Sequence, residues 1–178
     1  MDNSFSFYDT SVFSMDIGKD SYGNTILWVL TELGVMGYRI YYNGSSYILY
    51  SQSPLSFSCD FYLSSLTFDS SSKIRVDRQN NAWIITRHDG VRVIKSDATL
   101  WPTGDGFTYD NSPILSDYVY DIAFDNENGQ VYLATENGIS ILDVPFSIEN
   151  ESLESIYITP QPFVIPSEGP MVIKKILS

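Results

Sequence analysis

The stretch VYDIAFDNENGQVYLATENGISIL, residues 119–142, decides the fold predicted for this chain. An alternating strand ends in Asp125, a polar turn follows, and a second strand carries Tyr132 and ends in Thr135. A short turn then reaches Gly138, where a third strand begins. Alternation of apolar and polar residues over such short segments is typical of β-strands that bury one face.

The same pattern occurs twice more in the chain. One copy reads KIRVDRQNNAWIITRHDGVRVI (73–94), and a more degenerate copy reads VFSMDIGKDSYGNTILWVLTELGVMGYRIYY (12–42). A repeat of about 50 residues built from short strands is typical of β-propeller blades. The equivalent marker residues, in chain order, are Asp20, Trp28, Thr31 and Gly34; Asp77, Trp83, Thr86 and Gly90; and Asp125, Tyr132, Thr135 and Gly138.

Each marker has a physical role in a small antiparallel sheet. Asp at a strand end accepts hydrogen bonds from the backbone N–H groups of the next turn. The Thr hydroxyl satisfies a neighbouring backbone group, and Gly permits the sharp reversal that follows. An aromatic on the second strand offers a large face for packing against the next sheet.

Composition agrees with an all-β fold. Aromatic residues make up 15% of the chain, led by 13 Tyr, and residues that favour strands outnumber Ala, Glu and Lys. We predict a partial β-propeller of about three four-stranded blades at about 8–55, 56–110 and 111–145. A linker and the first strands of a C-terminal β-sandwich-like domain follow at 146–178. Because propellers close with four to eight blades, we expect the remaining blades to come from a longer parent chain or from self-association.

The charge distribution argues against two classes of partner. The net charge is −12, and no basic residue occurs between Lys95 and Lys174. Such a surface repels the phosphate backbone of nucleic acid and an anionic membrane. No apolar run reaches the length of a transmembrane helix, so we expect no membrane insertion. The first ten residues, MDNSFSFYDT, lack a basic and an apolar region, so we expect no signal peptide in this chain.

Residues for metal binding or catalysis are few. His88 and Cys59 are the single histidine and cysteine, which argues against a zinc site, and no nucleophile motif accompanies His88. The acidic turn 125–129 departs from EF-hand spacing and reads as a capped hairpin turn. We therefore predict no cofactor, no metal and no enzyme activity. Carboxylates are numerous enough to supply a pair for glycoside hydrolysis, but no local signature picks out two of them.

The loop WPTGDGFTYD, residues 101–110, is the candidate binding site. It joins aromatic residues to carboxylates, a combination that suits sugar rings, which stack on aromatic faces and donate hydroxyl groups. The candidate binding residues are Trp101, Asp105, Phe107 and Tyr109. The alternative is that Trp101 and Phe107 pack between blades, because large aromatic side chains are usually buried.

The three copies resemble the two-component-regulator type of propeller repeat. Residues 112–142 are similar to PorZ-like proteins of the type IX secretion system, with Leu115, Ser116, Asp117 and Val119 at the positions that lead into the blade. The tail 155–176 looks like the start of the β-sandwich that follows such propellers. Its usual "YPNPF" opening appears as residues 158–163, with Gln161 in place of Asn.

This resemblance implies an extracytoplasmic protein, in the periplasm or at the cell surface of a bacterium. It further implies a non-catalytic module that binds a protein or glycan partner at the cell envelope. Two alternatives stay open. One is the periplasmic sensor propeller of a hybrid two-component histidine kinase, and the other is part of a secreted glycan-degrading enzyme.

Overall fold

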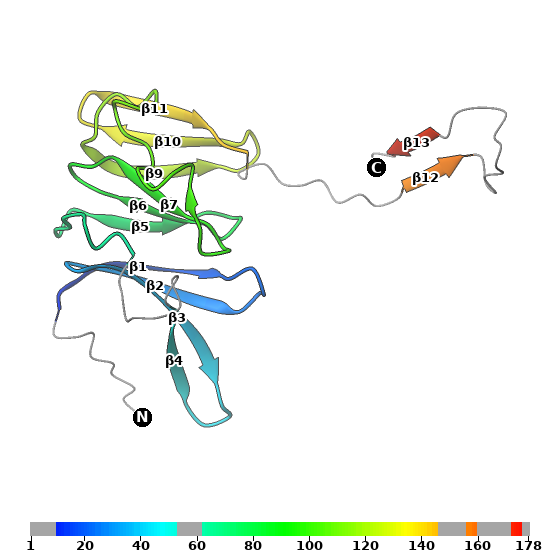
Figure 1. The fold of residues 1–178 in the computed structure, drawn as a ribbon, viewed down its shortest axis with the longest axis horizontal. Helices are drawn as coiled ribbons and strands as arrows, with labels where there is room; N and C mark the ends of the chain where they lie inside the picture. Colours follow the sequence, from blue (N-terminus) through cyan, green and yellow to red (C-terminus); the bar gives the residue numbers. More distant parts are fainter. Residues whose placement is uncertain (1–9, 53–61, 146–155, 160–171, 176–178) are drawn as a thin grey trace. The chain divides into compact units, whose positions relative to one another are not determined.

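Three antiparallel sheets, one for each copy of the repeat, follow one another along the first 145 residues (Figure 1). The computed structural model describes residues 10–52, 62–145, 156–159 and 172–175, and within these ranges every regular element is a β-strand. The sheets do not close into a ring. The predicted fold class, an all-β partial propeller, is confirmed, and we call the sheets blade 1, blade 2 and blade 3.

Each blade is a meander in which consecutive strands pair. Blades 1 and 2 have four strands each, in the orders β1-β2-β3-β4 and β5-β6-β7-β8. Blade 3 has three strands in the described part of the chain, ordered β11-β10-β9, where the repeat predicts four. The strands are β1 (Val12–Lys19), β2 (Thr25–Thr31), β3 (Gly34–Tyr42), β4 (Tyr47–Gln52), β5 (Lys73–Val76), β6 (Ala82–Ile85), β7 (Val91–Ile94), β8 (Leu100–Trp101), β9 (Val119–Asp125), β10 (Gln130–Thr135) and β11 (Gly138–Asp143).

The chain divides into two compact units, residues 1–148 and residues 149–178. In the second unit β12 (Ile156–Thr159) pairs antiparallel with β13 (Val172–Lys175). Residues 160–163, which carry most of the tail motif, lie outside the described residues. The predicted start of a β-sandwich and the predicted blade boundaries stay predictions.

The Thr and Gly markers make the same hydrogen bond in all three blades. The hydroxyl of Thr31, Thr86 and Thr135 donates to the carbonyl of Gly34, Gly90 and Gly138, at 3.0, 2.7 and 2.8 Å. The three threonines are buried, and the three glycines have positive φ, which favours glycine. This bond closes the turn between the second and third strands and fixes that end of each blade.

The Asp markers cap the other end of each second strand. The carboxylate of Asp77 accepts hydrogen bonds from the backbone N–H and the side-chain amide of Asn81, both at 2.9 Å. It also accepts one from the indole Nε1 of Trp83 at 2.9 Å. Asp20 and Asp125 bind Asn24 and Asn128 in the same manner. The marker therefore ties the turn between the first and second strands together.

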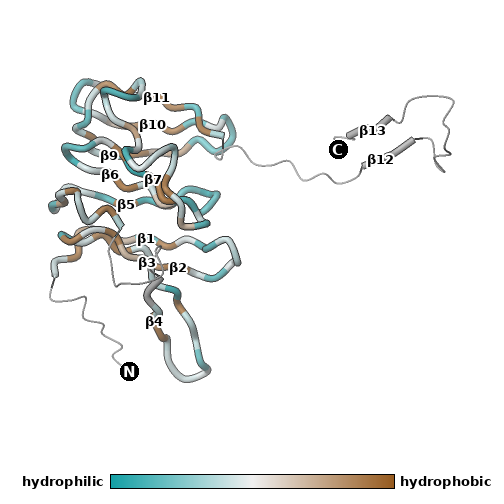
Figure 2. The backbone as a smooth tube through the Cα atoms, in the orientation of Figure 1, coloured by the Kyte–Doolittle hydropathy of each residue, from teal (hydrophilic) through white to brown (hydrophobic). Residues whose placement is uncertain are grey.

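Consecutive blades bury apolar faces against each other. The Trp28 face of blade 1 shares one buried cluster with Ile74 and Ile84 of blade 2. The Trp83 face of blade 2 shares a second cluster with Val131 and Leu133 of blade 3. Figure 2 shows the hydrophobic residues on the strands, while the connecting loops are mostly hydrophilic. Blade 2, covered on both sides, has fully buried β6 and β7 strands.

The segment that leads into each following blade adds a second link. Tyr62 forms an isolated antiparallel bridge with Val35, the second residue of β3, through hydrogen bonds of 2.9 Å in both directions. Phe107 forms the same bridge with Val91, the first residue of β7. Both aromatic rings are buried. Each blade is thus fixed to its successor by face packing and by backbone pairing.

We expect Asp77→Ala to lower the free energy of unfolding by about 2–4 kcal/mol, because buried donors lose their acceptor. Urea denaturation measures the loss. Asp125→Ala is the matched control, since the equivalent carboxylate in blade 3 caps a solvent-exposed turn. A loss at Asp125 as large as that at Asp77 would contradict this assignment of the stabilising interaction.

A charged pair joins blades 2 and 3 and predicts a dependence of stability on pH. The ammonium of Lys73 lies 2.9 Å from the carboxylate of Asp121, and its hydrogen bond holds the pKa of Asp121 below the usual range. A carboxyl whose pKa is lowered on folding stabilises the fold above its unfolded pKa of about 3.9. That contribution is lost as the pH falls through the folded pKa.

We expect Asp121→Asn to lower the free energy of unfolding at pH 7 by at most about 1 kcal/mol, because the pair is solvent-exposed and screened. The difference from the unmodified protein should shrink to zero by about pH 2. Urea denaturation at a series of pH values measures it. A difference that grows towards low pH would contradict the assigned role of the pair.

Candidate functional site

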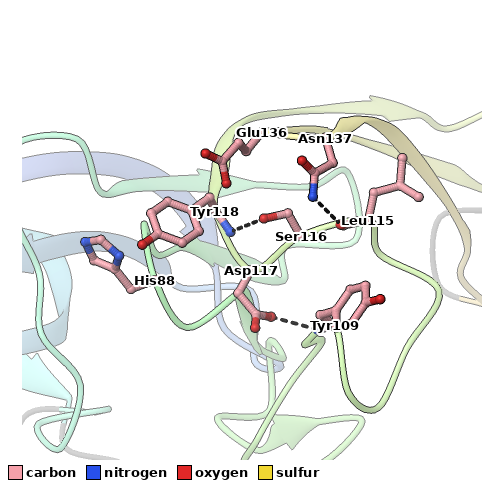
Figure 3. A pocket seen from close by; sticks show the side chains of 8 residues that line it. All are labelled: His88, Tyr109, Leu115, Ser116, Asp117, Tyr118, Glu136 and Asn137. Carbon is pink, nitrogen blue, oxygen red and sulfur yellow. Dashed lines mark hydrogen bonds between the residues drawn. The ribbon is translucent and has the colours of Figure 1, made fainter.

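A hollow of ≈ 510 Å³ lies where blades 2 and 3 meet, at the end that carries the Thr–Gly turns (Figure 3). We call it the rim pocket. It is lined by His88, Tyr109, Leu115, Ser116, Asp117, Tyr118, Glu136 and Asn137. A hollow of this size accommodates a small ligand or a side chain of a partner.

Three different segments supply these residues. His88 lies in the β6–β7 turn of blade 2, while Glu136 and Asn137 lie in the equivalent β10–β11 turn of blade 3. Tyr109 and the run 115–118 come from the connection between β8 and β9. The pocket therefore forms because the repeat brings equivalent turns of neighbouring blades to the same rim.

Hydrogen bonds hold the lining segments in place. The carboxylate of Asp117 accepts from the backbone N–H of Tyr109 at 2.7 Å, and its carbonyl accepts from the N–H of Gly90 at 3.1 Å. The Tyr118 carbonyl accepts from the N–H of Glu136 at 3.0 Å. The Asn137 side-chain amide donates to the Leu115 carbonyl at 3.1 Å (Figure 3). The connection between β8 and β9 is thus bonded to both turns.

The pocket presents aromatic surface to solvent. Tyr109 is 63% exposed and Tyr118 is exposed at the pocket wall. The His88 ring packs edge-on against Tyr118, with ring centroids 4.8 Å apart and an interplanar angle of 82°. Exposed aromatic side chains of this kind offer flat apolar faces to a ligand or partner.

A buried arginine on β7, Arg92, lies near several carboxylates of blade 2 and of the β8–β9 connection. Arg92 is almost fully buried and donates a hydrogen bond to the carbonyl of Asp89. Burial lowers the pKa of Arg92, and the carboxylates of Asp89, Asp105 and Asp117 oppose that shift. Its positive charge is therefore balanced by neighbouring carboxylates of the same chain.

The structure separates the four candidate residues of the 101–110 loop. Tyr109 lines the rim pocket, and the carboxylate of Asp105 lies within electrostatic reach of Arg92. Phe107 is buried and stacks on Trp83 with ring centroids 6.0 Å apart and an interplanar angle of 2°. Trp101 is half-buried and packs edge-on against Phe107 at 5.2 Å. Phe107 and Trp101 thus take the packing positions of the alternative interpretation, and the binding role of all four residues stays a prediction.

Sequence reasoning did not select Tyr118, Glu136 or Asn137 as binding residues. The repeat could have identified them, because it aligns the turns between the second and third strands, and equivalent turns of neighbouring blades lie at the same rim. Among the described residues no group of three or more His, Cys, Asp or Glu is placed to hold a metal ion. Cys59 lies outside the described residues, and His88 is exposed in its turn. In the described ranges no helix is long and apolar enough to cross a membrane.

Gly90, at the end of the β6–β7 turn, lies against the Phe107 backbone and gives a direct test of the local geometry. Its φ is +70°, and a Cβ atom there would lie 2.1 Å from the carbonyl oxygen of Phe107. We expect Gly90→Ala to lower the free energy of unfolding by about 3 kcal/mol or more, because strain and a backbone clash add. Urea denaturation measures the loss.

Gly23→Ala is the matched control for Gly90→Ala. Gly23 has φ +82° but nothing within 4 Å of an added Cβ, so only strain of about 1–2 kcal/mol remains. Equal losses for the two variants would contradict the close approach of the Gly90 turn to Phe107.

Solved structures similar to this chain include the following two. The first is PorZ, an essential bacterial surface component of the type IX secretion system of Porphyromonas gingivalis, with 22% sequence identity and a TM-score of 0.52. The match covers 84% of this chain and 20% of PorZ. The second is the extracellular domain of a protein described as a hybrid two-component system from B. thetaiotaomicron, with 20% identity and a TM-score of 0.44 over 75% of this chain and 17% of that one.

These matches cover most of this chain but only a small part of each matched protein. The chain spans about a fifth of the length of each of these two structures. No family model matches the chain, and no curated protein matches it. The similarity to PorZ confirms that the chain has a PorZ-like fold, as its repeats predict.

Proposed function

We propose that this chain is the recognition part of a bacterial propeller protein that works outside the cytoplasm, in the periplasm or at the cell surface. In this proposal it is a non-catalytic module that binds a protein or glycan partner through the rim pocket. The likeness in fold to PorZ, itself a surface component, supports the location.

The observation that carries the proposal is the convergence of exposed Tyr109 and Tyr118 with the carboxylates of Asp117 and Glu136. Aromatic faces take up the apolar side of a sugar ring or of a peptide side chain. Carboxylates accept hydrogen bonds from sugar hydroxyls or from peptide N–H groups. The aromatic rings thus provide complementary shape and the carboxylates select for hydrogen-bond donors, a combination that is common in ligand pockets.

The engagement of the pocket's polar groups supports a binding role over catalysis. One carboxylate oxygen of Asp117 accepts a hydrogen bond from the backbone N–H of Tyr109, and the His88 ring packs against Tyr118. The groups here hold the pocket in shape, which suits a preformed recognition surface.

A glycan array probed with the full chain, together with capture from a bacterial envelope extract, tests the proposal. We expect a specific partner whose affinity falls about tenfold or more in Tyr109→Ala and in Tyr118→Ala, because contact with an exposed aromatic is lost. Titration calorimetry with the captured partner measures the change.

Tyr22→Ala is the control, because Tyr22 is 87% exposed in the β1–β2 turn and lies outside the pocket. Partner binding that is equally strong in all three variants would rule out the rim pocket as the site. Cleavage of a bound glycan would replace the proposed role by the glycan-degrading alternative.

A further inference from the structure

The third and fourth strands of blade 1 extend beyond the sheet as a two-stranded arm. β2 pairs with β3 as far as Arg39. Beyond that residue, in the described part of the chain, β3 pairs only with β4, over three residue pairs that end at Tyr42 and Tyr47. In blade 2, by contrast, β7 pairs with β6 over its whole length. Figure 1 shows the β3–β4 hairpin projecting from the stack of blades, and we call its residues 40–49 the arm.

The tip of the arm consists of the residue types that dominate antibody binding loops. Residues 41–47 read YYNGSSY, so every one of them is Tyr, Asn, Gly or Ser. Tyrosine offers a large amphipathic surface at a small cost in conformational entropy, and the small polar residues adapt their hydrogen bonds. Tyr41, Tyr42 and Tyr47, and Tyr50 just beyond the arm, are each more than half exposed. This composition favours contact with another protein.

Contacts within the arm hold its tip in shape. The rings of Tyr42 and Tyr47 pack across the two strands with centroids 5.0 Å apart. The Tyr42 hydroxyl donates a hydrogen bond to the carbonyl of Gly44 at 3.0 Å. The side-chain oxygen of Asn43 accepts hydrogen bonds from two backbone N–H groups of the turn, both at 2.9 Å. An element that is already ordered loses less conformational entropy when it binds.

The outer edge of β4 has none of the features that prevent strand pairing. Among the described residues β4 pairs with β3 alone, and its residues Tyr47–Gln52 include no charge, proline or glycine. The edge strand of blade 2, β8, has only two residues and is followed at once by Pro102, which lacks a backbone N–H. The edge strand of blade 3, β11, ends in Asp143. Short strands, prolines and charges protect sheet edges, so the unprotected β4 edge is suited to strand addition.

The arm is uncharged although the chain is strongly acidic. No charged residue occurs between Arg39 and Asp60, while the net charge of the chain is −12. The guanidinium of Arg39 itself pairs with the carboxylate of Asp20 at 2.8 Å. A charged residue of a partner would lose water at this surface without gaining an ion pair, which is unfavourable. The segment that fits the arm is therefore uncharged.

We propose that the β4 edge binds an extended, uncharged segment of a partner protein, which adds a fifth strand to blade 1. The exposed edge of a strand is matched by another polypeptide backbone, so main-chain hydrogen bonds supply the pairing. Because side chains alternate between the two faces of a strand, the added segment contacts Tyr47 on one face and Tyr50 on the other. The site is distinct from the rim pocket and does not depend on it.

Selection of random linear peptides displayed on phage against the full chain tests the proposal. We expect the selected peptides to share a run in which apolar and uncharged polar residues alternate. Titration calorimetry with a synthetic selected peptide should give the same affinity at low and at high salt, because no ion pair forms.

Tyr47→Lys and Tyr50→Lys should each weaken binding of this peptide about tenfold or more, because each places a charge at the uncharged edge. Tyr22→Lys is the matched control and should leave the affinity unchanged, since it adds the same charge to a tyrosine that is 87% exposed in the β1–β2 turn. Tyr109→Ala, in the rim pocket, should also leave it unchanged. Circular dichroism and thermal unfolding establish that each variant is folded.

Amide hydrogen exchange measured by NMR locates the bound peptide. In an edge strand only every second backbone N–H bonds to the neighbouring strand. The amides of residues 47–52 should therefore alternate between slow and fast exchange in the free chain. When the peptide is bound, the fast amides should become slow, while the amides of β8 should not change.

Four results would overturn the proposal. The first is a selection that enriches no peptide of the alternating pattern. The second is slow exchange of every β4 amide in the free chain, which would mean that another segment of the chain already pairs with this edge. The third is peptide binding that Tyr109→Ala weakens and Tyr50→Lys does not, which would place the peptide in the rim pocket. The fourth is a dimer of the free chain that Tyr50→Lys dissociates, which would mean that a second copy occupies the edge.

Discussion

Burial of the second-strand tryptophan between neighbouring sheets is the interaction on which the rest of this structure depends. Trp83 donates to the capping Asp77, stacks on Phe107 of the following connection, and packs edge-on against Phe124 of blade 3. One side chain thus links its own turn, the incoming segment and the next sheet. A two- to four-stranded sheet has little stability alone, so this shared burial holds the blades together and positions the rim pocket.

The Asp marker makes different hydrogen bonds in blade 1, the more degenerate copy of the repeat. The carboxylate of Asp20 binds Arg39 at 2.8 Å as well as Asn24, and the Trp28 indole nitrogen is buried with no partner among the described residues. In blade 2 the equivalent carboxylate serves the tryptophan. In blade 1 the Asp20 carboxylate therefore binds Arg39 of β3, where in blade 2 the Asp77 carboxylate binds the tryptophan. Blade 1 keeps the packing of the repeat but loses one of its polar links.

The sequence pattern predicts the strands, the capping roles of Asp and Thr, and the aromatic positions, because these follow from local periodicity and turn chemistry. It does not distinguish Phe107 from Tyr109, which lie two residues apart in one loop. Phe107 is buried because Trp83 and other residues of neighbouring strands pack against it, and Tyr109 stays exposed. Nor does a linear pattern assemble the rim pocket, since His88 and Glu136 belong to different copies and meet only when blades stack.

The Thr–Gly turn separates what must stay constant from what is free to change. The buried hydroxyl and the glycine carbonyl fix the backbone of each turn, while the residues between them, such as His88 in one blade and Glu136 in another, point to the rim. Substitutions at these intervening positions leave the core untouched. Successive duplications of a blade therefore supply a row of independently variable side chains on a rigid support. A protein built in this way acquires new binding specificities by drift at its turns, much as antibody loops do on a conserved framework.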